Sequence, residues 1–180
     1  MTVSKGRLGE TWADTPGLPV ETDRLRLIPA TNTTLASESS DRTAFAKAVG
    51  AKVPDNWPPQ PCLDPDSPDG AAWWIWYFVL RRTDDEEPVL VGFGGFKGWP
   101  AVTGAVQLGC AFLEQHQAKG YGTEAVHAMT QWALAQSVGR VVAEVPFGNT
   151  ASIKVLTKLG FKPAGSQPDE KLLRYERLRA

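Results

Sequence analysis

The hydrophobic pattern changes its period at one point in the second half of the chain. Between residues 106 and 113, apolar residues alternate with small or polar ones, which is the two-residue period of a strand with one buried face. From Thr123 onward, apolar residues such as Val126 and Met129 recur at steps of three and four, which gives a helix one apolar face. Residues 116–123 are therefore predicted to form the junction at which a helix begins directly after a strand.

The same periods predict further elements on both sides of this junction. A first strand at residues 25–28 ends at Pro29, and a helical region follows from about residue 33 to 49. Because residues 31–40 are poor in helix formers, we expect two short helices with a break between them, and Asp41 as the N-cap of the second. Further strands are predicted at residues 73–80, 89–96, 141–145 and 171–178, with a helix after residue 149. Such a chain forms an α+β sheet with helices on both faces.

Two stretches have no period. Residues 1–20 mix Gly, Pro, Thr and charge, and we predict a flexible arm; the sequence leaves open whether it is disordered or packs across a second subunit of a homodimer through Leu8 and Trp12. Residues 50–70 carry six prolines and are predicted to form a long loop. Within this loop, Trp57 is either a wall of a substrate pocket or a staple that holds the loop to the core.

Composition narrows the classes of protein. The 180 residues, 42% of them hydrophobic, suffice for one core, so residues 21–180 are expected to form a single domain. A net charge of −1 gives no electrostatic case for nucleic acid or an anionic membrane. The two cysteines, Cys62 and Cys110, build no disulfide scaffold, and with His116 and His127 they show no metal-ligand spacing. With no apolar run of about 20 residues and no signal peptide, we expect a cytoplasmic protein without a metal.

The junction at residues 116–123 has the chemistry of an anion site. The first N–H groups of a helix have no intrahelical partner and carry about half a positive charge. Gly120 and Gly122 lack a Cβ, so a phosphate can approach the main chain closely, and Lys119 adds a positive charge. The alternative is an ordinary strand-to-helix turn with two glycines. No Gly-Lys-Ser or Gly-Lys-Thr follows, and the third glycine of a dinucleotide-binding fingerprint is missing.

Three motifs in the chain carry a family resemblance. Gln117-x-x-Gly120-x-Gly122 resembles the pyrophosphate loop of the GNAT superfamily of acetyl-CoA-dependent N-acetyltransferases. Asn149-x-x-Ser152, with Lys-Leu-Gly-Phe at residues 158–161, resembles the second half of the same cofactor site. The opening Glu-Thr-Asp-Arg-Leu-Arg-Leu at residues 21–27 is similar to the start of the branch that includes RimJ and RimL.

This resemblance runs from about residue 21 to the C-terminus and implies one N-acetyltransferase domain. It implies a mostly antiparallel twisted sheet of six to seven strands with a V-shaped splay between strands 4 and 5, and acetyl-CoA as cofactor with CoA as product. Main-chain N–H groups near Phe112 and Leu113 would hold the pantetheine arm and the thioester oxygen. The cofactor-binding residues so implied are Phe112, Leu113, Gln117, Ala118, Lys119, Gly120, Tyr121, Gly122, Thr123, Asn149 and Ser152.

Catalytic candidates follow from the same resemblance. Ser152 occupies the position that would stabilise or protonate the leaving thiolate, whose pKa is near that of free cysteine, about 8.5. Many members use a tyrosine four residues later, where this chain has Leu156. Asn149 is expected to cap the following helix, to contact the cofactor arm, or both.

The general base is not settled by the sequence. Gln107 stands where several branches carry a glutamate, and an amide cannot accept the proton; Cys110 stands where the RimL-like branch often has tyrosine. Glu144, Glu114 acting through water, and bulk solvent remain alternatives.

The expected function is transfer of the acetyl group of acetyl-CoA to a primary amine by direct attack in a ternary complex. The acceptor is a protein N-terminus, an amino acid or another small-molecule amine, and neither nucleic acid nor a membrane is an expected partner. The alternative is a non-catalytic or weakly catalytic acyl-CoA-binding protein of the same fold, motivated by Gln107 and Leu156.

Overall fold

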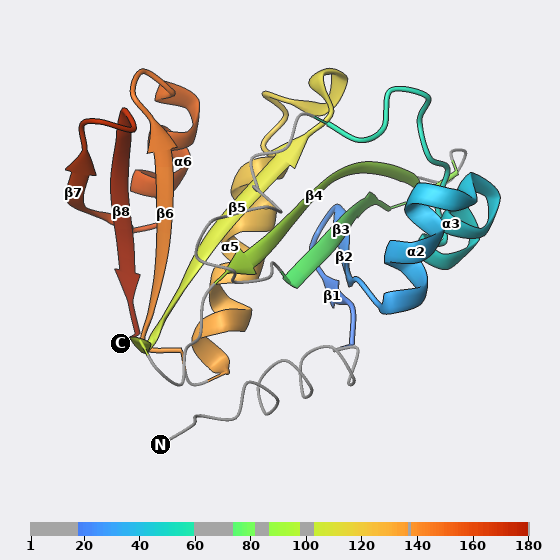
Figure 1. Cartoon of the computed structure of the whole chain (residues 1–180), viewed down its shortest axis with the longest axis horizontal. Helices are drawn as coiled ribbons and strands as arrows, with labels where there is room; N and C mark the ends of the chain where they lie inside the picture. Colours follow the sequence, from blue (N-terminus) through green and yellow to red (C-terminus); the bar gives the residue numbers. More distant parts are fainter. Residues whose placement is uncertain (1–17, 60–73, 82–86, 98–102, 137, 180) are drawn as a thin grey trace.

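One sheet organises the chain in the computed structural model, which describes residues 18–59, 74–81, 87–97, 103–136 and 138–179. Within these residues the sheet has eight strands in the order β1-β2-β3-β4-β5-β6-β8-β7 (Figure 1). The strands are β1 Val20–Glu21, β2 Leu25–Pro29, β3 Trp74–Leu80, β4 Val89–Lys97, β5 Ala105–Phe112, β6 Arg140–Pro146, β7 Lys162–Gln167 and β8 Leu172–Leu178. The helices are α2 Asn32–Ser40, α3 Arg42–Val49, α5 Tyr121–Ala135 and α6 Thr150–Lys158, with a 3₁₀ turn η1 at Glu114–His116.

Neighbouring strands are antiparallel except for β5 and β6. Parallel strands need a crossover, and α5 supplies it. The strand–helix–strand unit predicted around residues 106–145 is therefore confirmed, as is the α+β class.

The sheet separates two apolar clusters. One cluster contains Leu108, Met129 and Leu156, so α5 and α6 cover the same face of the sheet. The other contains Phe45 and Tyr77, which places α2 and α3 on the opposite face. Side chains that alternate along β5 and β6 therefore point either toward α5 and α6 or toward the α2–α3 face.

The parallel pairing of β5 with β6 is short. It runs from Ala105 opposite Arg140 to Gln107 opposite Val142 and then stops, although both strands continue. Figure 1 shows the two strands diverging from that point. The V-shaped splay predicted between strands 4 and 5 is thus present. It lies between β5 and β6 because β1 was not foreseen, and the sheet has eight strands rather than six to seven.

The two short helices predicted between residues 33 and 49 are present, with the break between them at Asp41. Asp41 caps α3 by accepting a hydrogen bond from the N–H of Ala44 at 2.9 Å, as expected. The first of the two helices has weak propensity, and a reciprocal capping box between Thr31 and Thr34 stabilises its start.

Two short strands were missed. Val20 pairs with Leu27, so the predicted arm of residues 1–20 extends too far, and its residues 1–17, including Leu8 and Trp12, lie outside the described part. The sequence does not predict β7, because its residues show no apolar alternation, and in the structure they are mostly exposed. It is an edge strand formed by its ladder to β8, with an irregularity at Gly165.

Candidate functional site

The loop between β5 and α5 presents an open helix N-terminus. Among the described residues no side chain caps α5, and the first N–H to bond within the helix is that of Glu124, which donates to the carbonyl of Gly120 at 3.2 Å. The amides of Tyr121, Gly122 and Thr123 therefore have no intrahelical acceptor. These donors, at the positive end of a 15-residue helix, form an anion-binding geometry.

Left-handed backbone shapes this loop. Gly120 is the N-cap residue with φ +84°, and Ala118 has φ +57°. A non-glycine residue in this region costs on the order of 1 kcal/mol, and such residues cluster at functional sites. The Gln117 side chain holds the loop to the end of β5 by donating to the carbonyl of Phe112 at 2.9 Å. The loop is thus folded back on the strand from which it leaves.

Beyond Gln107, no described strand pairs with the edge of β5 that faces β6. Leu113 donates its N–H to the carbonyl of Val91 on β4 at 2.9 Å. Its amide therefore does not serve a bound pantetheine arm, contrary to the expectation. Because amides alternate between the two edges of a strand, the N–H of Phe112 points to the opposite edge, where β6 has already diverged.

Asn149 and Ser152 stand on the other side of the splay, where α6 follows β6. The Asn149 side chain accepts a hydrogen bond from the N–H of Ser152 at 3.1 Å, which confirms its capping role. The hydroxyl of Ser152 belongs to a half-buried residue in the first turn of α6. Leu156, one turn further on, is 5% exposed and belongs to the core.

Glu144 bridges the two strands where they part. Gln107 donates its side-chain amide to Glu144 at 3.0 Å, and Arg174 of β8 lies 3.5 Å from the other carboxylate oxygen. The Glu144 side chain is 17% exposed. Glu144 is thus a largely buried carboxylate where β5 and β6 part, rather than a solvated surface group. Glu114, the other proposed base, is exposed in η1.

The environments of Cys110, His116 and His127 do not favour a catalytic role for these side chains. Burial raises the pKa of the Cys110 thiol to about 11, so it is protonated at neutral pH and is a poor nucleophile. Burial and the nearby charge of Lys119 lower the pKa of His116, which is therefore neutral at pH 7. His127 is exposed on α5. None of the three has the features of a general base held by a partner group.

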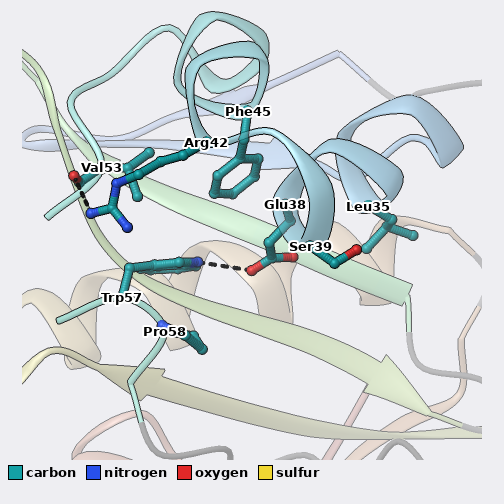
Figure 2. Close-up of a pocket in the computed structure, with 8 residues that line it drawn as sticks. All are labelled: Leu35, Glu38, Ser39, Arg42, Phe45, Val53, Trp57 and Pro58. Atoms are coloured by element: carbon teal, nitrogen blue, oxygen red, sulfur yellow. Dashed lines mark hydrogen bonds between the residues drawn. The ribbon is translucent and has the colours of Figure 1, made fainter. Parts of the chain in front are cut away.

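A pocket of about 370 Å³ lies on the α2–α3 face (Figure 2). Its lining residues are Leu35, Glu38, Ser39, Arg42, Phe45, Val53, Trp57 and Pro58. The Glu38 carboxylate accepts hydrogen bonds from the indole N–H of Trp57 at 2.8 Å and from the hydroxyl of Tyr77 at 2.5 Å. Burial, with the hydrogen bond and charge of Glu38, raises the pKa of Tyr77, so both partners of Glu38 are neutral donors. No sequence motif pointed to Glu38.

Trp57 holds its loop to the core, one of the two roles that the sequence left open, and it also lines this pocket. Its ring packs against Phe45, Tyr77 and Phe93 with centroid distances of 6.0–6.2 Å. The same loop reaches the end of β5, since Asn56 and Gln115 exchange side-chain hydrogen bonds at 3.0 and 3.3 Å.

The described residues contain neither a metal-binding cluster nor a membrane-spanning helix. No group of three or more His, Cys, Asp or Glu side chains there is arranged to hold a metal ion. No helix in the same part of the chain is long and apolar enough to span a membrane.

Comparison with known proteins gives consistent matches. Residues 35–162 match the family model described as acetyltransferase (GNAT) domain. The uncharacterized N-acetyltransferase YjdG of Bacillus subtilis is 30% identical over 154 residues, covering 79% of this chain and 88% of YjdG. An L-methionine sulfoximine/L-methionine sulfone acetyltransferase of Pseudomonas aeruginosa is 29% identical over 94 residues, covering 51% of this chain and 55% of that protein.

Solved structures share the fold. RimL, a ribosomal L7/L12 alpha-N-protein acetyltransferase in complex with coenzyme A, superposes with a TM-score of 0.60 at 17% identity, covering 89% of this chain and 97% of RimL. The ribosomal-protein-S5-alanine acetyltransferase of Vibrio fischeri superposes with a TM-score of 0.57 at 18% identity, covering 90% of this chain and 97% of that protein. The chain therefore belongs to the GNAT acetyltransferase family and is an N-acetyltransferase that uses acetyl-CoA.

Proposed function

We propose that this enzyme transfers the acetyl group of acetyl-CoA to a primary amine by direct attack, with both substrates bound at once. The observation that carries the proposal is the uncapped N-terminus of α5 beside the unpaired edge of β5. The diphosphate would bind residues 117–123, and the pantetheine arm would lie along the β5 edge near Phe112. Asn149 and Ser152 would contact the arm from α6. Bound acetyl-CoA supplies a thioester, an activated acyl group with a good leaving thiol.

The chemistry balances with few protein groups. An ammonium with a pKa of about 10 must lose a proton before its nitrogen can attack the thioester carbonyl carbon. As the C–N bond forms and the C–S bond breaks, the second amine proton leaves and the thiolate gains one. Burial raises the pKa of the Cys110 thiol, so this side chain is a poor nucleophile for a covalent acyl-enzyme intermediate, which supports direct attack by the amine.

The test of the function is thiol release from acetyl-CoA across a panel of acceptors. The panel contains N-terminal peptides, amino acids and small amines, because the similar proteins are named for acceptors of more than one kind. We expect at least one amine to give turnover well above acetyl-CoA hydrolysis. Tight CoA binding without turnover on any amine would contradict the enzymatic proposal.

Glu144 is proposed as the base that accepts the ammonium proton. Glu144→Gln keeps hydrogen-bonding atoms for Gln107 and Arg174 but cannot take a proton at neutral pH. We expect kcat to fall about 100-fold at pH 7, with a smaller deficit as the pH approaches the pKa of the amine. Glu114→Gln, an exposed carboxylate in η1, is the matched control and is expected to change kcat by less than about threefold. Equally small losses of kcat in both variants would indicate that solvent, and not Glu144, accepts the ammonium proton.

The acceptor is proposed to place its non-reacting end in the pocket beside Glu38. Three contacts connect the pocket to the end of β5. The ring of Trp57 packs on Phe93, and Phe93 pairs with Ala111 of β5. Asn56, next to Trp57, donates a hydrogen bond to Gln115, which follows β5. Glu38 has only neutral donors among the partners described, so its charge is free to attract a cation between aromatic rings. Arg42, at the rim, is engaged by the carbonyls of Val53 and Pro54.

Glu38→Gln tests the acceptor proposal because the amide oxygen still accepts from Trp57 while the charge is lost. For a diamine, kcat/KM is expected to fall about tenfold, the loss typical of one hydrogen bond to a charged group. A monoamine of the same length is the control substrate and should be nearly unaffected. If the ratio of kcat/KM for the diamine to kcat/KM for the monoamine is the same in Glu38→Gln as in the wild type, Glu38 only holds the loop in place.

A further inference from the structure

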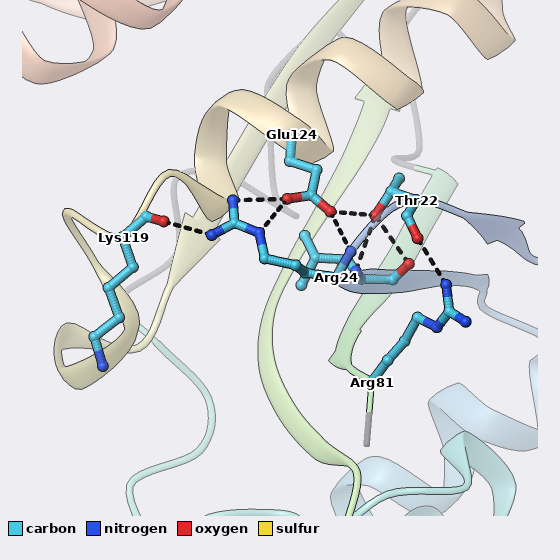
Figure 3. A network of polar contacts seen from close by, with 6 residues as sticks. Thr22, Arg24, Arg81, Lys119 and Glu124 are labelled. Carbon is cyan, nitrogen blue, oxygen red and sulfur yellow. Dashed lines mark hydrogen bonds and ion pairs between the residues drawn. The ribbon is translucent and has the colours of Figure 1, made fainter. Parts of the chain in front are cut away.

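A polar cluster ties the start of β2 to the first turn of α5 (Figure 3). We call Thr22, Arg24 and Glu124 the loop anchor. One oxygen of the Glu124 carboxylate lies 2.7 Å from Nη2 and 2.8 Å from Nε of Arg24. The other accepts the main-chain N–H of Arg24 at 2.7 Å and the Thr22 hydroxyl at 2.5 Å. Four contacts thus converge on one carboxylate across about a hundred residues of sequence.

The anchor reaches directly into the loop before α5. Arg24 donates from Nη1 to the carbonyl of Lys119 at 2.9 Å. Its guanidinium lies 4.6 Å from the centre of the Tyr121 ring. A single side chain therefore contacts the residues on both sides of Gly120, the N-cap of α5.

We propose that Arg24 and Glu124 are positioning residues for the acetyl-CoA diphosphate. This inference rests on the proposed function, in which the diphosphate binds residues 117–123. The anchor acts in two ways: it sets the direction of one peptide group in the loop, and it neutralises a negative charge next to the anion site.

The direction of the peptide follows from its planarity. In a trans peptide the C=O of one residue and the N–H of the next point in opposite directions. Because Arg24 holds the carbonyl oxygen of Lys119, the N–H of Gly120 points away from the anchor. Without Arg24 this peptide is free to rotate, and a carbonyl oxygen turned toward the diphosphate would repel it.

The charge argument concerns Glu124. Burial alone would raise its pKa, but the hydrogen bonds from Thr22 and Arg24 outweigh burial and the pKa is lowered, so the group is ionised at neutral pH. A carboxylate in the first turn of a helix is favourable to the helix dipole but opposes a bound anion. Arg24 offsets that charge at 2.7 Å, and the Glu124 side chain is only 15% exposed. Removing Arg24 alone therefore leaves an uncompensated negative charge beside the diphosphate site.

The experiment measures the dissociation constants of CoA and of pantetheine, which lacks the diphosphate. Calorimetry is performed on the wild type, Arg24→Gln, Glu124→Gln and the double variant. For Arg24→Gln we expect CoA binding to weaken about 10- to 100-fold, the range for hydrogen bonds to charged groups, while pantetheine binding stays within about threefold. The double variant should bind CoA more tightly than Arg24→Gln, because the opposing charge is gone.

Arg26→Gln is the matched control. Arg26 lies in β2, two residues after Arg24, and pairs with Glu21 at 3.1 Å, with both side chains half exposed. This variant is expected to bind CoA like the wild type. Arg24→Lys is a milder change, because it keeps the charge but loses the planar guanidinium that reaches both Glu124 and Lys119. Its CoA affinity should lie between those of the wild type and Arg24→Gln.

Several results would overturn the inference. They are CoA affinity in Arg24→Gln equal to that in Arg26→Gln, equal losses for CoA and pantetheine, or a double variant that binds CoA more weakly than Arg24→Gln. A wild type that binds no CoA would instead contradict the proposed function itself. If Gly120→Val loses CoA binding while Arg24→Gln and Arg24→Lys keep it, the diphosphate loop stands and the anchor does not position it.

Discussion

Replacing Gly120 with valine is expected to abolish CoA binding while the sheet stays folded. Gly120 has φ +84°, a conformation that costs an L-residue about 1–2 kcal/mol. A Cβ there would lie 3.2 Å from Nη2 of Arg24, so the side chain displaces the guanidinium as well as the loop. We expect the dissociation constant of CoA, measured by calorimetry, to rise more than about 100-fold, which corresponds to nearly 3 kcal/mol.

Gly50→Val is the control for backbone strain. Gly50 also has a left-handed backbone, with φ +63°, and a Cβ there would meet nothing within 4 Å. It ends α3, away from α5, so its replacement is expected to lower the melting temperature without changing CoA affinity. Unchanged CoA affinity in Gly120→Val would contradict the assignment of the diphosphate to residues 117–123.

Replacing Ser152 with alanine is expected to lower kcat about 100-fold with little change in CoA affinity. A hydroxyl that stabilises or protonates the leaving thiolate acts mainly in the transition state, where general acid catalysis contributes about 10²–10⁴-fold. Removing it should not weaken α6, because the cap from Asn149 is made to the main-chain N–H of Ser152. The measurement is single-turnover kinetics at saturating acetyl-CoA, together with the dissociation constant of CoA.

Two companion variants sharpen this prediction. Ser152→Thr keeps the hydroxyl and is expected to retain most of the activity. Ser40→Ala removes an exposed helical hydroxyl that bonds only the carbonyl of Ala36 among its described contacts, and should leave kcat unchanged. If Ser152→Ala loses CoA affinity by the same factor as kcat/KM, Ser152 contributes to binding and not to the departure of the thiolate.

The strands at the centre of the sheet were predictable because their signal is local. β3, β4 and β5 bury alternate or continuous apolar residues, and this pattern survives any tertiary arrangement. β7 was not predictable, because its six mostly exposed residues are held by main-chain bonds to β8 rather than by burial. β1 is two residues long and has too little sequence to show a period.

The candidate site divides in the same manner. The loop before α5 has a recognisable motif because Gln117, Gly120 and Gly122 are close in sequence. Asn149 is recognisable as the N-cap of the helix that directly follows it. Glu38, Trp57 and Tyr77 come from three separate elements, and nothing in their sequence spacing indicates that they meet. The sequence left three alternatives for the proton acceptor. The structure distinguishes Glu144 from the exposed Glu114 by its low exposure and by the hydrogen bond that it accepts from Gln107.

The amino-acid sequence by itself determined the helices, the strands other than β1 and β7, the glycine loop at the start of α5 and the motifs of the family, because each depends on residues that are neighbours along the chain. Only the tertiary structure decided which amides of β5 remain open, where Glu144 lies, and that Arg24 holds the loop nearly a hundred residues away. These features depend on strand register and on contacts between distant segments. Such contacts are set by how the whole sheet packs, and no local pattern encodes them.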